Sequence, residues 1–139
     1  MAFPTKILLA TDGSKDATLA AQDAIDLSDQ SGAELHVVYV GHSSLTQSPT
    51  EYRTAAQERL DELVTKVEDA GVTVAEAHLR MDTQGSMEVE NIVGLAEELG
   101  TDLIVIGSQG LSRMKRLLMG SVSEWVVRLA HCPVLVMRH

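Results

Sequence analysis

Short apolar runs alternate along the chain with longer segments whose apolar residues recur at helical spacing. The runs rich in Ile, Leu and Val predict strands at Lys6–Thr11, Glu34–Val40, Val72–Leu79, Leu103–Ile106 and Val134–Met137. The segments between them predict helices at Ser14–Ser31, Thr50–Ala70, Ser86–Leu99 and Ser121–Ala130. Glycines at positions 32, 71 and 100 follow the first three helices, where they can end a helix in the left-handed conformation.

A regular alternation of strand and helix is typical of a parallel sheet with helices on both faces. We therefore expect an α/β fold with a five-stranded parallel sheet in the order 3-2-1-4-5, in a single domain over residues 1–139. The third strand has alternating apolar residues, at Val72, Val74, Ala77 and Leu79, which indicates an edge position. The last strand is wholly apolar, and because exposed apolar edges are usually covered, it predicts a homodimer through Val134–Met137.

The composition, 45% hydrophobic and 22% charged, is that of a folded globular protein. No apolar run is long enough for a membrane span, and the N-terminus lacks the pattern of a signal peptide, so we expect a cytoplasmic protein. The single cysteine, Cys132, excludes an internal disulfide and is expected to be buried. The sequence has no zinc-ligand spacing, and His36, His78 and His139 form no recognisable constellation.

The net charge of −9 argues against nucleic acid as a partner. Residues 103–139, however, contain five basic side chains and one acidic side chain. Three of the basic residues, Arg113, Lys115 and Arg116, lie close together. This cluster favours an anionic small ligand, with a solvated basic loop as the alternative.

The segment from Gly107 to Ser123 follows a buried strand, contains three glycines and leads into a helix. Glycines let the backbone approach a ligand closely, and the free N–H groups of a helix's first turn attract anions. In open parallel sheets, ligands bind beyond the carboxyl ends of the strands where the strand order reverses. This places Asp12, after the first strand, opposite the glycine loop. Asp12 can accept hydrogen bonds from ribose or help hold a metal ion near phosphates; its alternative role is to cap the first helix.

Other nucleotide and hydrolase motifs are missing from the sequence. It contains no G-x-x-x-x-G-K-[ST], no G-x-G-x-x-G after the first strand and no G-x-S-x-G elbow. A P-loop NTPase, a dinucleotide-binding Rossmann site and a hydrolase triad are therefore not expected.

The spacing Gly107-x2-Gly110-x9-Gly120-Ser121 resembles the nucleotide motif G-x2-G-x9-G-[S/T] of the universal stress protein family. Further blocks agree with it: KILLATDGS near the start, DLIVIGSQG before the loop, LLMGSVSE after it and CPVLV near the end. The likeness covers essentially the whole chain.

The resemblance implies a Rossmann-like fold, similar to the adenine nucleotide alpha hydrolases, that binds ATP and dimerises through its last strand. Carried over by position, Asp12 would hold the adenosine, and Ala10, Thr11, Val40 and Ile106 would surround the adenine. The ribose and phosphates would be contacted by Gly107, Gly110, Gly120, Ser121, Val122 and Ser123, with a further contact from Ser108. Mg²⁺ is a candidate ion to be bound together with the ATP.

Binding is better supported by the sequence than catalysis is. A convincing general base is missing: His42, after the second strand, is a weak candidate, and His131 is better placed to interact with the dipole of the fourth helix. We therefore expect a nucleotide-dependent stress-response or signalling module, with an unidentified protein as its further partner. The alternatives are a slow ATPase and a dimerisation module without functional nucleotide binding. Trp125 is expected to pack in the core or at the dimer contact rather than against a ligand.

Overall fold

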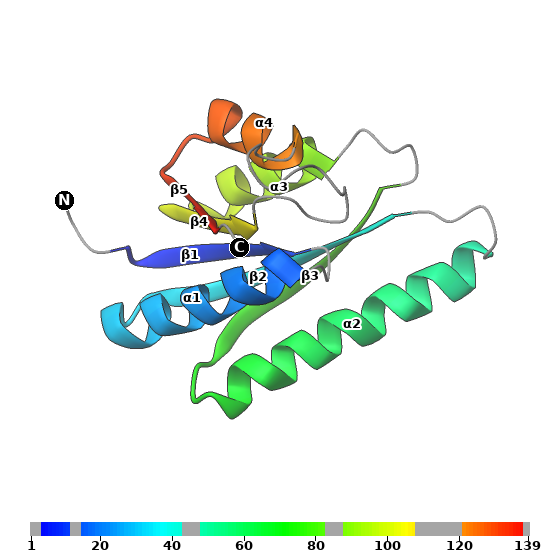
Figure 1. Ribbon diagram of the computed structural model, residues 1–139, viewed down its shortest axis with the longest axis horizontal. Coiled ribbons are helices and arrows are strands. Elements are labelled where there is room, and N and C mark those ends of the chain that lie inside the picture. The colour runs from blue at the N-terminus through cyan, green and yellow to red at the C-terminus, as the bar shows by residue number, and fades with distance from the viewer. Residues whose placement is uncertain (1–3, 12–14, 43–47, 83–87, 108–120, 138–139) are drawn as a thin grey trace.

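A central parallel β-sheet with helices on both faces forms the framework of the molecule (Figure 1). The computed structural model describes residues 4–11, 15–42, 48–82, 88–107 and 121–137. Its strands are β1 (Lys6–Thr11), β2 (Glu34–His42), β3 (Val74–Asp82), β4 (Leu103–Gly107) and β5 (Val134–Met137). Its helices are α1 (Lys15–Ser31), α2 (Pro49–Asp69), α3 (Glu88–Leu99) and α4 (Ser121–Leu129).

The strands lie in the order β3-β2-β1-β4-β5, and every pair is parallel. The order predicted from the sequence is confirmed, including the edge positions of β3 and β5. Because the chain moves from β1 to β2 on one side and later returns to place β4 on the other side, the strand order reverses between β1 and β4.

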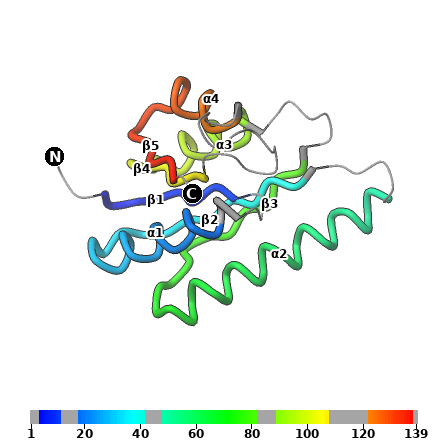
Figure 2. The backbone as a smooth tube through the Cα atoms, in the orientation of Figure 1, coloured from blue at the N-terminus to red at the C-terminus, as the bar shows by residue number. Residues whose placement is uncertain are grey.

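Two apolar layers separate the sheet from its helices. In Figures 1 and 2, α1 and α2 lie on one face of the sheet, and α3 and α4 lie on the other. Side chains alternate between the faces along each strand: in β1, Ile7 and Leu9 belong to the layer against α1 and α2, whereas Leu8 and Ala10 belong to the opposite layer. Burial on both faces explains why the central strands are almost continuously apolar.

The helix ends follow the signals in the sequence. Ser48 caps α2 by accepting a hydrogen bond from the Glu51 main-chain N–H, and the Glu51 side chain accepts one from the Ser48 N–H in return. Gly32, Gly71 and Gly100 have φ angles of 73°, 90° and 67°, so each follows its helix in the left-handed region that glycine tolerates best.

Several predictions of detail were wrong. The strand expected at Val72–Leu79 begins at Val74 and continues to Asp82, because the Val72 N–H still bonds to the Val67 carbonyl at the end of α2. Cys132 is only partly buried, against the layer beneath α3 and α4. Trp125 is 51% exposed on α4, so it does not pack in the core, and a place at the dimer contact stays the prediction for it.

Candidate functional site

The carboxyl ends of β1 and β4 lie side by side at the reversal of strand order. Ala10 pairs with Ile106 in the register of these strands, and β4 ends one residue later, at Gly107. On its other side, Ala10 pairs with Val38 of β2. Segments far apart in the sequence therefore meet at the carboxyl ends of the strands, where α/β proteins bind ligands.

Three of the predicted adenine-site residues share one face of the sheet near the carboxyl ends of the strands. Ala10, Val40 and Ile106 are each at most 6% exposed, and all three belong to the apolar layer beneath α3 and α4. Val122, in the first turn of α4, packs against the same layer. The ends of β1, β2 and β4 thus provide an apolar floor built from small and medium-sized side chains.

Thr11 lies on the opposite face. Its side chain lines a pocket of about 190 Å³ together with Tyr39 and with Arg59, Glu62 and Lys66 of α2. The alternation of side chains along β1 causes this separation from Ala10. The Thr11 side chain is therefore not brought together with the other predicted adenine-site residues.

A buried hydrogen bond joins α4 to the end of β4. The Ser123 Oγ donates to the main-chain carbonyl of Gly107 at 2.6 Å, and Ser123 is only 3% exposed. This bond holds the first turn of α4 beside the last residue of β4. The N–H groups of a helix's first turn have no partner within the helix, so this end of α4 can receive an anion.

The remaining predicted site residues fall largely outside the described part of the chain. Asp12, Ser108, Gly110 and Gly120 are outside it, as is the basic cluster at positions 113, 115 and 116. For Ser121, the structure gives its place as the first residue of α4. Their contributions to a site remain predictions from the motif.

Two of the histidines judged unrelated in the sequence lie together. His36 of β2 and His78 of β3 are stacked, with their ring centroids 6.0 Å apart, and Glu76 lies beside both. Burial lowers the pKa of His78 below its ordinary 6.5, against the opposing effect of Glu76, so this ring is neutral at pH 7. The repeated pattern Glu-x-His, at Glu34–His36 and Glu76–His78, was the signal in the sequence.

His131, which is expected to interact with the dipole of α4, makes a hydrogen bond to another part of the chain. Its Nε2 lies 2.9 Å from the main-chain carbonyl of Thr101, and because a carbonyl only accepts, the ring nitrogen donates. The bond ties the segment after α4 to the start of β4.

Among the described helices, none is both long and apolar enough to cross a membrane.

The strand order defines an open parallel α/β protein with an apolar floor at the reversal of strand order, and comparisons with known proteins agree with that class. The model of the universal stress protein family matches residues 4–138. The universal stress protein YxiE of Bacillus subtilis is 32% identical over 145 residues, an alignment that covers 96% of this chain and 98% of YxiE. The chain therefore belongs to the universal stress protein family.

Solved structures show the same architecture. Protein MJ0577, whose biochemical function was assigned from its structure, superposes with a TM-score of 0.83 at 25% identity, covering 100% of this chain and 98% of that one. A universal stress protein from Archaeoglobus fulgidus in complex with dAMP superposes with a TM-score of 0.73 at 25% identity, covering 99% and 100%. The dAMP complex identifies an adenine nucleotide as a ligand of that relative.

Proposed function

We propose that this protein binds ATP at the carboxyl ends of β1 and β4 and acts as a nucleotide-dependent stress-response or signalling module. The observation that carries the proposal is the convergence of Ala10, Val40 and Ile106 on one face at the reversal of strand order. The complete G-x2-G-x9-G-S motif begins at Gly107, the last residue of β4, and ends at Ser121, the first residue of α4. The dAMP complex of the Archaeoglobus relative supports the ligand class.

The residues at the strand ends suit an adenine nucleotide. The apolar floor provided by Ala10, Val40 and Ile106 matches the flat, largely apolar faces of an adenine ring. Gly107 ends β4 without a side chain that would hinder close approach of a ligand. Thr11 would contribute through its main chain, because its side chain lies on the opposite face.

The polar parts of the nucleotide would meet the loop and the start of α4. Asp12 would accept hydrogen bonds from the ribose or hold Mg²⁺. The phosphates would lie against the residues of the motif and the helix after it, which are Gly107, Ser108, Gly110, Gly120, Ser121, Val122 and Ser123. Since the Ser123 hydroxyl donates to Gly107, Ser123 would meet a phosphate through its main-chain N–H.

The molecule in solution is proposed to be a homodimer of single-domain chains, joined through β5. All four residues of this edge strand, Val134–Met137, are apolar and only partly buried. In this dimer, ATP occupancy would change the loop and the dimer surface that a protein partner recognises.

Titration calorimetry with ATP tests the proposed site. Asp12→Ala removes the carboxylate, and Gly110→Val places a branched side chain where the motif predicts that the ligand approaches. We expect each variant to weaken ATP binding at least about tenfold, the equivalent of one lost charge-assisted hydrogen bond or one steric conflict.

Gly94→Ala is the matched control for the glycine variant. Gly94 lies on α3, and a Cβ atom there would meet nothing within 4 Å, so ATP affinity should be unchanged. Wild-type affinity in both Asp12→Ala and Gly110→Val would refute the site assignment. Failure of the wild-type protein to bind ATP would leave the dimerisation module as the better description.

A further inference from the structure

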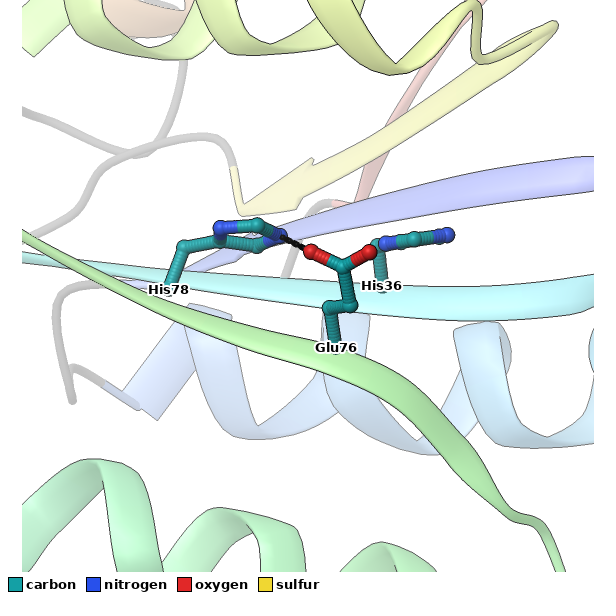
Figure 3. A group of neighbouring side chains, drawn as sticks. All are labelled: His36, Glu76 and His78. Atoms are coloured by element: carbon teal, nitrogen blue, oxygen red, sulfur yellow. Dashed lines mark ion pairs between the residues drawn. The ribbon is translucent and has the colours of Figure 1, made fainter.

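A second group of side chains, polar ones, lies on the same face of the sheet as the apolar floor but toward the edge strand β3, where His78 pairs with Val38 of β2. His36, Glu76 and His78 each contribute one side-chain ligand atom to a group whose members all lie within 4.8 Å of one another. His36 comes from β2, and the other two come from β3. Figure 3 shows the Glu76 carboxylate between the two imidazole rings, with one oxygen toward each ring.

A β-bulge brings these side chains to the same face. Leu35 pairs with Val74, but the next residue, His36, pairs with Glu76, so Ala75 is the extra residue of β3. Val74 therefore packs with the layer against α1 and α2. After the bulge, Glu76 and His78 share the opposite face with His36.

Each imidazole presents a buried nitrogen without a hydrogen-bond partner to this group. The Nδ1 of His36 and the Nε2 of His78 are both inaccessible and unpaired, and His36 is only 3% exposed. The His78 Nε2 lies 3.5 Å from a Glu76 oxygen, a contact that does not have hydrogen-bond geometry. Leaving such groups unpaired is costly, which indicates that something else satisfies them.

Glu34 holds His36 in the tautomer that a cation requires. Its Oε2 lies 3.1 Å from the His36 Nε2, and because an ionised carboxylate only accepts, Nε2 carries the proton. In the neutral ring the lone pair of Nδ1 is then free, and it faces Glu76 (Figure 3). A carboxylate on the far nitrogen of a ligating histidine is the usual support of a metal-bound imidazole.

We propose that His36 Nδ1, His78 Nε2 and the Glu76 carboxylate form a binding site for Zn²⁺ or a similar divalent transition-metal ion. Two imidazoles suit zinc, whereas Ca²⁺ and Mg²⁺ prefer oxygen ligands alone. Zinc bonds of about 2.0–2.1 Å in tetrahedral geometry place the ligand atoms about 3.3 Å apart. Because the three atoms lie within 4.8 Å of one another, the group must close by up to roughly 1.5 Å. Glu76, whose side chain is 60% exposed, has the freedom to move. The ion would join the edge strand β3 to β2.

Zinc titration of the chelator-treated, nucleotide-free protein tests this site. Calorimetry should give one Zn²⁺ per chain, and the melting temperature should rise with zinc concentration, because a ligand of the folded state stabilises it. Glu76→Gln and His78→Gln should each weaken binding at least about tenfold. X-ray absorption of the zinc-loaded wild-type protein should report two imidazole ligands, and His78→Gln should reduce them to one.

Two matched variants distinguish this site from zinc bound elsewhere on the surface. Glu90→Gln removes an exposed carboxylate of α3, and His131→Gln removes a histidine bonded to Thr101. Both should bind zinc as the wild type does, with circular dichroism confirming that every variant is folded. Absence of zinc binding by the wild type, or equal affinity in all four variants, would overturn the proposal. ATP binding is measured separately and does not depend on either outcome.

Discussion

Gly41, near the end of β2, occupies a place where an added methyl group would make unusually tight contacts. A Cβ atom there would lie 3.1 Å from the Met81 sulfur and 3.2 Å from the Cβ of Ala56. Met81 is flexible, but Ala56 is fixed by the backbone of α2, which packs directly on β2 at this point. The glycine therefore sets how closely α2 approaches the sheet.

The same substitution at two glycines should have opposite effects. Gly41→Ala should destabilise the protein by about 1 kcal/mol, because the added methyl overpacks the contact with α2. Gly94→Ala should stabilise it by about 0.5–1 kcal/mol, because Gly94 lies within α3 with open space around it and alanine favours the helix. Urea denaturation of both variants checks the two signs, and a stabilised Gly41→Ala would show that α2 can move away.

At the scale of the elements, Asp102 fixes how the chain enters β1 beside β4. Its carboxylate accepts hydrogen bonds from the Thr5 N–H, the Thr5 hydroxyl and the Lys6 N–H, at 2.8–3.1 Å. Partial burial opposes ionisation, but these hydrogen bonds outweigh it and lower the pKa of Asp102 below its ordinary 3.8. Asp102 therefore connects the starts of β1 and β4 through a hydrogen bond to Lys6, which lies 96 residues before it in the sequence.

Asp102→Ala should destabilise the protein by about 1–2 kcal/mol at pH 7, toward the lower value because the site is exposed to solvent. A carboxyl whose pKa is lowered on folding stabilises the folded state above its unfolded pKa of about 3.8, and this contribution is lost as the pH falls through the folded pKa. The difference from the wild type should thus be constant between about pH 5 and 7 and shrink below about pH 4. Urea unfolding at several pH values measures it.

Asp29→Ala, an exposed change on α1, serves as the control for that series. It should alter the free energy of unfolding by no more than about 0.5 kcal/mol. A stability difference for Asp102→Ala that stays the same down to pH 3 would contradict the role given to the ionised carboxylate.

The order of the elements was predictable because four of the strands are largely apolar runs, the third strand has alternating apolar residues, and three of the helices are followed by a glycine. The apolar floor of the candidate site was also predictable, since Ala10 and Ile106 end adjacent central strands. Simple alternation along β1 places the Thr11 side chain on the face opposite to Ala10, so the four adenine-site residues that the family resemblance implies do not share one face.

The repeated Glu-x-His pattern is a trace of the histidine pair in the sequence, but the pattern alone does not decide whether the two rings meet, because that depends on the register of β2 and β3. Without the bulge at Ala75, Glu76 and His78 would lie on the face opposite to His36. The apolar positions of β3 do contain a trace of the bulge, since Val74 has an even number whereas Leu79 and Met81 have odd numbers in the same layer. That change of phase is a usable signal in other edge strands.

At the scale of the whole molecule, the exposed apolar surface gathers near the C-terminal end of the chain. Trp125, Val127 and Leu129 of α4 are 51%, 45% and 53% exposed, and β5 beside them is an edge strand. Surfaces of this kind usually mark contacts between proteins. The proposed dimer through β5 would cover part of it.

Val136→Lys should convert the proposed dimer into a monomer, because lysine on an edge strand opposes pairing with a second chain. Sedimentation equilibrium at micromolar concentration measures the change. Val127→Lys places the same charge on α4 and should leave the dimer intact. The reverse pattern would move the interface to α4, and a monomeric wild type would contradict the dimer itself.

The central position of β1 has a consequence for the synthesis of this protein. β1 is completed at residue 11, but its partner on one side, β4, begins only at residue 103. While the ribosome makes the intervening residues, β1 can pair with β2, yet its other edge has no native partner. Parallel pairing across so long a separation is slow and leaves an apolar edge open to other nascent chains. A central strand of the finished protein therefore keeps one edge unpaired for most of the time that the chain is being translated.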